Sequence, residues 1–168
     1  TRNTCTMRPP LSAACTDLAP LEAILARHAG SEGALLPVLH RVQERFGYIP
    51  PDAVPLIAHE LNLSRAEVHG VITFYHDFRQ APPGKCVVKV CQAEACQAMG
   101  AQALTRHARE RLGADLHATS TDGAYTLEPT YCLGNCALSP AIMIDGQLHG
   151  RVSPQRFDAL IDAAQNAP

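Results

Sequence analysis

The sequence lacks the features that mark several large functional classes. Its formal net charge is −2 at pH 7, and its Lys and Arg residues are scattered, so it offers no basic surface for nucleic acid. No apolar run approaches the roughly 20 residues that cross a bilayer. We therefore expect neither a nucleic-acid-binding protein nor a membrane-spanning one.

Motifs for nucleotides and for dithiol chemistry are missing as well. No strand-like segment is followed by G-x-G-x-x-G, and the chain has no phosphate-binding P-loop. A C-x-x-C motif at the start of a helix, which a dithiol oxidoreductase would normally show, is also absent. The sequence thus predicts no NADH, flavin or nucleotide site.

What is present is the composition of a globular protein with unusual cysteine content. Apolar residues make up 46% of the 168 residues, enough for a core in one or two domains. Residues 1–16 lack the charged start and long apolar middle of a signal peptide, so we expect a loose leader and a cytoplasmic protein. Seven cysteines in a reducing compartment favour metal or redox chemistry over a disulfide framework.

The first half of the chain, residues 17–81, has the apolar periodicity of helices. Four short helical segments joined by brief connections predict a small bundle. The segments are 16–30, 31–50, 50–64 and 64–78. The predicted caps are Thr16 or Asp17, Ser31, and Ser64 with Glu67 in a capping box, and the predicted stops are Gly30 and Gly47.

The "RQAPPGK" stretch ends this helical pattern and places a domain boundary near residue 82. Residues 82–168 alternate between strand-like and helix-like segments. The predicted strands are 85–90, 124–131 and two around the Asp145-Gly146 turn, and the predicted helices are 97–113 and 153–165, the last capped by Ser153. This order predicts an α/β fold in which helices cover a small sheet, of the thioredoxin-like kind.

Two cysteine pairs follow predicted strands: Cys91 with Cys96, and Cys132 with Cys136. Parallel neighbours in an α/β sheet send their following loops to the same edge, where ligands usually bind. We therefore expect four thiolates to converge there. Cys86 lies at the opposite end of the first strand, roughly 16 Å from Cys91, and is predicted to be core.

Cys5 and Cys15, in the leader, are likewise predicted to lie outside the site. Four converging thiolates can hold a structural zinc ion or a [2Fe-2S] cluster, and they can also remain unmetallated. Spacings of four and three residues are wider than most zinc knuckles. Gly134 and the small residues Ala93, Ala95 and Ala137 permit close backbone approach, so that amides can point at the sulfurs.

"CQAEACQAMGA", with "CLGNCALSP" beginning 36 positions after its second cysteine, resembles the 24-kDa-type [2Fe-2S] subunit family of NADH dehydrogenases. The helical stretches "LLPVLHRVQERFGYIP" and "SRAEVHGVITFYHDFRQAPPGK" are similar to that family too. The resemblance implies a helical bundle followed by a thioredoxin-like [2Fe-2S] ferredoxin domain. The cluster ligands that it implies are Cys91, Cys96, Cys132 and Cys136.

Within this family, the chain looks most like the gamma subunit of soluble NAD-dependent formate dehydrogenase. The resemblance implies a non-catalytic electron-transfer subunit of an oxidoreductase. Its partners would be a flavin- and NADH-binding subunit and, through it, a molybdenum-type formate dehydrogenase subunit. The equivalent subunits of NAD-reducing hydrogenase and respiratory NADH dehydrogenase are alternatives, as is a zinc-stabilised interaction module. Whether isolated copies dimerise stays open.

The histidines are predicted to be surface or packed residues. His59 and His69 are ten positions apart, which is not the spacing of a metalloprotease motif. His76, His107 and His149 could approach the cysteines, but four cysteines suffice without them.

Two further features carry alternatives. The "GVITFY" stretch is predicted to pack in the core, the alternative being an exposed partner-binding surface. Pro140 follows Cys136 closely and could be either the cis proline found beside many thioredoxin-like sites or an ordinary trans proline.

Overall fold

The structure is a computed structural model and describes residues 18–28 and 30–165. The described residues form two compact units, 18–82 and 83–165. Predictions on the leader, on Cys5 and Cys15, and on caps at Thr16 or Asp17 lie outside the described residues. No helix within the described ranges is long and apolar enough to span a membrane.

The first unit contains the four predicted helices: α1 (Ala19–His28), α2 (Leu35–Phe46), α3 (Ala53–Glu60) and α4 (Arg65–Phe74). Each helix turns an apolar stripe toward a shared core, which is why short helices are stable here. Helix α1 packs on α2 and α3, and α4 also packs on both α2 and α3. The core includes Leu21, Val38, Leu39, Val42, Ile57 and Val68, all fully buried.

The ends of these helices follow local chemistry. Ser64 and Glu67 form the predicted capping box, because the Glu67 N–H donates to Ser64 Oγ at 3.2 Å and the Ser64 N–H donates to the Glu67 carboxylate at 2.8 Å. Gly47 ends α2 as predicted, in the left-handed conformation with φ of 85°.

The predicted cap at Ser31 is wrong. Helix α2 begins only at Leu35, and its N-terminal residue Ala34 provides no side-chain cap. Gly33 lies between Ser31 and the start of α2, and its φ of 67° is a left-handed conformation that a right-handed helix cannot include. The turn around this glycine delays the start of the helix.

The second unit is built on a five-stranded sheet in the order β2-β3-β1-β4-β5. Strands β1 and β3 are parallel, with Cys86 opposite Tyr125 and Cys91 opposite Thr130, and the other neighbours are antiparallel. The strands are β1 (Cys86–Cys91), β2 (Ala118–Thr119), β3 (Tyr125–Thr130), β4 (Ile142–Ile144) and β5 (Gln147–His149). The helices are α5 (Glu94–Ala98), α6 (Ala101–Leu112), the 3₁₀ turn η1 (Cys136–Leu138) and α7 (Pro154–Gln165).

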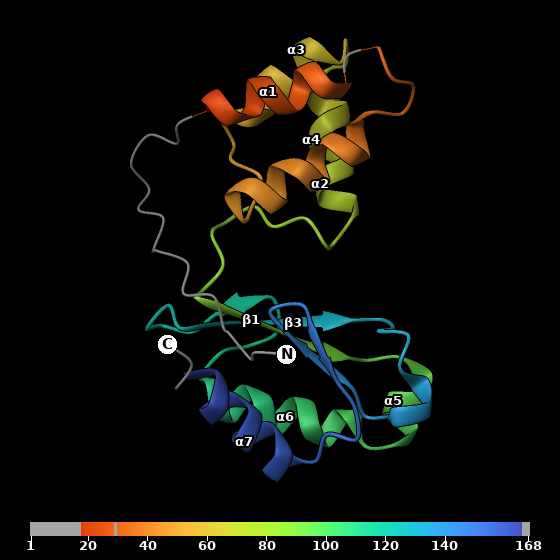
Figure 1. The fold of residues 1–168 in the computed structure, drawn as a ribbon, viewed down its shortest axis with the longest axis vertical. Coiled ribbons are helices and arrows are strands. Elements are labelled where there is room, and N and C mark those ends of the chain that lie inside the picture. Colours follow the sequence, from red (N-terminus) through yellow and green to blue (C-terminus); the bar gives the residue numbers. More distant parts are fainter. Residues whose placement is uncertain (1–17, 29, 166–168) are drawn as a thin grey trace. The chain divides into compact units, whose positions relative to one another are not determined.

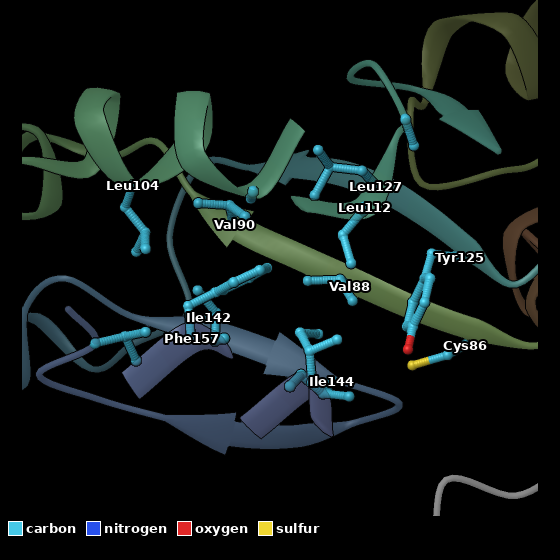
Figure 2. Packing of buried hydrophobic residues seen from close by; sticks show 14 residues of the cluster. Cys86, Val88, Val90, Leu104, Leu112, Tyr125, Leu127, Ile142, Ile144 and Phe157 are labelled. Carbon is cyan, nitrogen blue, oxygen red and sulfur yellow. The ribbon is translucent and has the colours of Figure 1, made fainter. Parts of the chain in front are cut away.

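Helices α6 and α7 lie on the same side of the sheet (Figure 1). The alternating residues Cys86, Val88 and Val90 of β1 are buried in the core that these helices share with the sheet, together with Phe157 of α7 (Figure 2). Fully burying an aromatic side chain such as Phe157 contributes about 1.5–3 kcal/mol. Cys86 is only 3% exposed, so its predicted place in the core is confirmed.

The predicted helix 97–113 is in fact two helices. Helix α5 ends at Ala98 and α6 begins at Ala101, because Gly100 adopts a left-handed φ of 92° that breaks the helical path. The apolar periodicity continues across the break, which is why the sequence pattern did not reveal it. The break gives α5 a direction of its own.

The edge strand β2 was not predicted. It has only two residues, Ala118 and Thr119, too few for a visible alternation. The predicted hairpin is confirmed, with Asp145 and Gly146 both at positive φ between β4 and β5. The cap of α7 is confirmed as well, since the Arg156 N–H donates to Ser153 Oγ at 3.2 Å.

Candidate metal centre

The two cysteine segments leave the sheet side by side. Strands β1 and β3 run parallel and end together, with Cys91 opposite Thr130. The Gln92 N–H donates to the Thr130 carbonyl at 2.7 Å, which holds the two exits together one residue beyond the strands. Cys132 follows two residues after Thr130. The parallel pairing therefore brings both segments to one edge, as predicted, and Figure 1 shows α5 beside the segment that follows β3.

The inner pair consists of Cys91 and Cys96, and each is only 2% exposed. Cys91 is the last residue of β1, and the short helix α5 carries Cys96 back toward it. The two pack with the buried alanines Ala101 and Ala141. Alanines leave room beside a sulfur, so the backbone can approach both thiols closely.

The outer pair consists of Cys132 and Cys136, and both are exposed. Their sulfurs lie 3.9 Å apart. Two thiolates on one tetrahedral ion with metal–sulfur bonds of about 2.3 Å lie about 3.8 Å apart, so the observed separation suits a shared metal. Gly134 turns the segment at a φ of 72° and donates its N–H to Cys132 Sγ at 3.3 Å.

Hydrogen bonds link the two cysteine segments. The backbone amide of Leu133 donates to the sulfur of Cys91, and the backbone amide of Ala141 donates to the sulfur of Cys96. Ser139 Oγ lies 3.5 Å from Cys96 Sγ and donates to the Cys136 carbonyl at 2.7 Å. The predicted pattern of amides pointing at sulfurs is therefore present.

The charge state of these thiols depends on burial and on each other. Burial raises the pKa of the Cys91 thiol, although the amides of Ala93 and Leu133 act in the opposite direction. Burial also raises the pKa of Cys96, but hydrogen bonds from Ser139, Cys91 and Ala141 outweigh it, and the net pKa is lowered.

The pKa of Cys136 is raised by its hydrogen bond with Cys132, by the charge of Cys132 and, more weakly, by Cys96. Thiolates this close repel one another, so a positive charge between them favours their joint deprotonation. A metal centre supplies that charge, which is why metal binding and thiol deprotonation are coupled.

The sulfurs are grouped as two pairs. Across residues 18–28 and 30–165, no three Cys, His, Asp or Glu side chains converge on a single metal-ion position. A four-cysteine zinc site places all four sulfurs around one ion, whereas a [2Fe-2S] cluster takes two cysteines per iron. In the outer pair, the 3.9 Å between Cys132 Sγ and Cys136 Sγ suits two ligands of one metal.

The histidines are distributed over both units. His107 on α6 is hydrogen-bonded to Asp158 on α7 at 2.8 Å, so it serves helix packing. His149 lies in β5, and burial, together with the charge of Arg156, lowers its pKa. His59, His69 and His76 belong to the helical unit.

The "GVITFY" stretch divides between core and surface. Ile72 is 3% exposed, as the packing prediction requires, but Phe74 is 73% exposed and Tyr75 43%. The packing prediction is therefore wrong for the two aromatic residues, because α4 ends at Phe74 and turns them away from the core.

The Ser139-Pro140 peptide bond is cis, which decides between the two alternatives for Pro140.

Sequence reasoning missed Ser139. This serine is 8% exposed and contacts both cysteine pairs, through Cys96 Sγ and the Cys136 carbonyl. Its only signal in the sequence was its position, three residues after Cys136 and directly before Pro140.

Comparison with known proteins agrees with this geometry. Residues 21–165 match the family model described as thioredoxin-like [2Fe-2S] ferredoxin. The chain is 33% identical over 148 residues to a subunit of the NADH-quinone oxidoreductase of Pseudomonas aeruginosa, covering 88% of this chain and 89% of that protein. It is 35% identical over 130 residues to the HndA subunit of the NADP-reducing hydrogenase of Solidesulfovibrio fructosivorans, covering 77% and 76%.

Among solved structures, a chain of an air-oxidised NAD⁺-reducing [NiFe]-hydrogenase is similar, with a TM-score of 0.67 and 25% sequence identity. The match covers 79% of this chain but only 23% of the hydrogenase chain. The predicted thioredoxin-like α/β fold is confirmed.

Proposed function

Because the chain belongs to the thioredoxin-like [2Fe-2S] ferredoxin family, whose cofactor is a [2Fe-2S] cluster, we propose that the four cysteines at the sheet edge hold one such cluster. The proposed ligands are Cys91 and Cys96 on one iron and Cys132 and Cys136 on the other. When bound, the cluster supplies one-electron chemistry. The protein is then an electron-transfer subunit and has no catalytic residue of its own.

The observation that carries this proposal is the arrangement of the sulfurs. They form two pairs, and the sulfurs of Cys132 and Cys136 are 3.9 Å apart, as two ligands of one tetrahedral metal should be. The inner pair is buried, whereas the outer pair reaches the surface. Because electron tunnelling weakens steeply with distance, the outer pair marks the edge where electrons enter and leave.

Exposed apolar side chains flank this edge. Tyr131 directly precedes Cys132 and is 75% exposed, and Leu138 in η1 is 39% exposed. Apolar residues beside an exposed redox site suit a protein partner that also excludes water. We propose that this edge faces the flavin- and NADH-binding subunit of the same complex, with which the protein exchanges single electrons.

We further propose that the parent complex is a soluble NAD-dependent formate dehydrogenase with a molybdenum-type catalytic subunit. The resemblance of "VCQAEACQAMGA" and of the segment around "CLGNC" supports this choice. The similar subunits of NADH-quinone oxidoreductase and NADP-reducing hydrogenase support the two alternatives. A cytoplasmic location is part of the proposal, because metal or redox use of a high cysteine content suits a reducing compartment.

Anaerobic purification of the full chain tests the cluster. We expect a red-brown protein with about two iron and two sulfide per chain that becomes paramagnetic after one-electron reduction. A colourless protein with stoichiometric zinc and no iron would support the zinc-stabilised module instead. Dithiol-dependent reductase activity of a metal-free protein would indicate a thiol-disulfide oxidoreductase.

Affinity purification of the intact complex tests the parent enzyme. The complex is assayed for NAD⁺ reduction with formate and with hydrogen, and for NADH oxidation with a quinone. Formate-dependent NAD⁺ reduction is expected. Activity with hydrogen or quinone alone would assign the subunit to one of the alternative complexes.

A further inference from the structure

Ser139 lies between the two cysteine pairs. Its side chain is almost fully buried, at 8% exposure. Its Oγ is 3.5 Å from Cys96 Sγ of the inner pair, and it also donates a hydrogen bond to the carbonyl oxygen of Cys136, a residue of the outer pair, at 2.7 Å. A single hydroxyl therefore contacts both halves of the proposed cluster site.

This hydroxyl has only one proton to donate. With Cys96 in the thiol form, the S–H donates to Ser139 Oγ, and the hydroxyl proton can point at the Cys136 carbonyl. A metal-bound Cys96 has lost its proton. The contact between Ser139 and Cys96 is then attractive only if the hydroxyl rotates and donates to the sulfur.

We propose that Ser139 is a positioning residue that raises the reduction potential of the site by donating its hydroxyl proton to the Cys96 sulfur. The inference rests on the proposed function, because it requires Cys96 to be a cluster ligand. The Oγ–H bond stays intact throughout, so no proton is transferred. The single electron comes from an external donor, which in the test is a chemical reductant.

The physical reason is the charge on the sulfur. An added electron makes the ligand sulfurs more negative, and a hydrogen bond to a more negative acceptor is stronger. Burial strengthens the effect, because Ser139 and Cys96 are both shielded from water. The hydroxyl thus stabilises the reduced form more than the oxidised form.

Other hydrogen bonds in the site do not involve this hydroxyl. The amide of Ala141 already donates to Cys96, and η1 is closed by the Leu138 N–H, which donates to the Asn135 carbonyl at 3.0 Å. The Cys136 residue is exposed, so water can serve its carbonyl when the serine is absent. Ser139→Ala is therefore expected to keep its cluster.

A matched control exists in the same unit. Ser120 is as buried as Ser139, at 7% exposure, and accepts the Tyr125 N–H at 3.0 Å. Tyr125 begins β3, whereas the cysteine segments follow its other end, and a six-residue strand is about 20 Å long. Ser120→Ala removes a buried hydroxyl without touching a cysteine.

The test is a redox titration of the holoprotein, following the visible spectrum. We expect a more negative midpoint potential for Ser139→Ala, a value near wild type for Ser139→Thr, which keeps the hydroxyl, and no change for Ser120→Ala. A cluster-loaded Ser139→Ala protein with the wild-type potential overturns the proposal.

A measurement on the wild type decides the case in which Ser139→Ala does not fold. Resonance Raman spectra are recorded promptly after dilution into D₂O, when hydroxyls have exchanged and buried amides have not. The exposed Gly134 amide, which donates to Cys132, also exchanges promptly. The readout is therefore the Fe–S(Cys) stretching bands of the iron that Cys91 and Cys96 are proposed to hold. A prompt shift of those bands supports the hydroxyl donor, and unchanged bands overturn it. A wild-type protein without iron contradicts the proposed function itself, which distinguishes the two failures.

Discussion

Gln92 and Thr130 are joined by a backbone hydrogen bond of 2.7 Å at the point where two parallel strands end. The bond extends the β1 and β3 pairing by one residue and holds the two cysteine segments at a common edge. Cys91 lies just before this bond on one side, and Cys132 just after it on the other. The site therefore depends on the register of the central strands.

Removal of an inner cysteine should abolish cluster binding. In Cys96→Ala one buried ligand is lost, so visible absorbance per chain should fall to a small fraction of the wild-type value. Cys86→Ala is the control, because Cys86 is equally buried but lies at the other end of β1. It should keep the absorbance and lose about 1 kcal/mol of stability through the smaller core side chain. Equal loss of absorbance in both variants would contradict the ligand assignment.

Gly134→Ala should weaken binding of the cluster by the outer cysteine pair. A Cβ at Gly134 meets no atom within 4 Å, so its cost, about 1–2 kcal/mol, arises from the left-handed backbone alone. Relaxation of this turn moves the amide that donates to Cys132. We expect faster loss of visible absorbance in the presence of a chelator.

Gly113→Ala is the control for this backbone cost. Gly113 also has open space around it and a left-handed φ of 61°, but it follows the end of α6 opposite Ala101, which packs with Cys91 and Cys96. It should lower the melting temperature without changing the rate of cluster loss. The same rate increase in both variants would assign the effect to general destabilisation.

Iron removal should affect the two units differently. The second unit contains the four proposed ligand thiols, whose deprotonation a bound metal favours, whereas the helical unit has a separate apolar core. Thermal unfolding is measured by circular dichroism. We expect apo and holo protein to share the transition of the helical unit and to differ in the transition of the second unit. Identical unfolding curves with and without the cluster would contradict this.

Acid should destabilise the helical unit through Glu67. Hydrogen bonds from the Ser64 amide and hydroxyl hold the pKa of this carboxyl below its ordinary value of 4.5. A depressed folded-state pKa means that the contribution is present above pH 4.5 and is lost as the pH falls through the lower, folded-state value.

Glu67→Gln removes this titration and retains the capping-box partner. Below pH 4.5, the melting temperature of the helical unit should therefore fall less steeply in the variant than in the wild type. Parallel pH profiles for both proteins would show that Glu67 does not contribute.

Substitution of Leu138 should weaken electron exchange with the flavin partner without loss of the cluster. Leu138 and Leu56 are both 39% exposed, but only Leu138 lies beside the outer cysteines. Leu138→Ser should raise the apparent Kd for the partner by about five-fold or more, the effect of losing about 1 kcal/mol at an interface. Leu56→Ser should leave it unchanged, as measured by partner-dependent reduction rates across a concentration series. A wild-type Kd in Leu138→Ser would exclude this edge as the contact.

Local patterns in the sequence predicted much of the fold. The capping box at Ser64 and Glu67, the stop at Gly47 and the hairpin at Asp145 and Gly146 are all confirmed. Such features depend on neighbouring residues, whose chemistry a sequence shows directly. The break at Gly100 and the two-residue strand β2 were missed, because neither disturbs the apolar periodicity.

The sequence by itself determined the number, type and spacing of the cysteines at the strand ends, and so the class of chemistry they can perform. Only the tertiary structure decided that Cys91 and Cys96 are buried while Cys132 and Cys136 are exposed, and that Ser139 lies between the pairs. The reason is physical. Spacing and side-chain chemistry are properties of the chain, whereas burial and the approach of residues 43 positions apart arise when distant segments pack together.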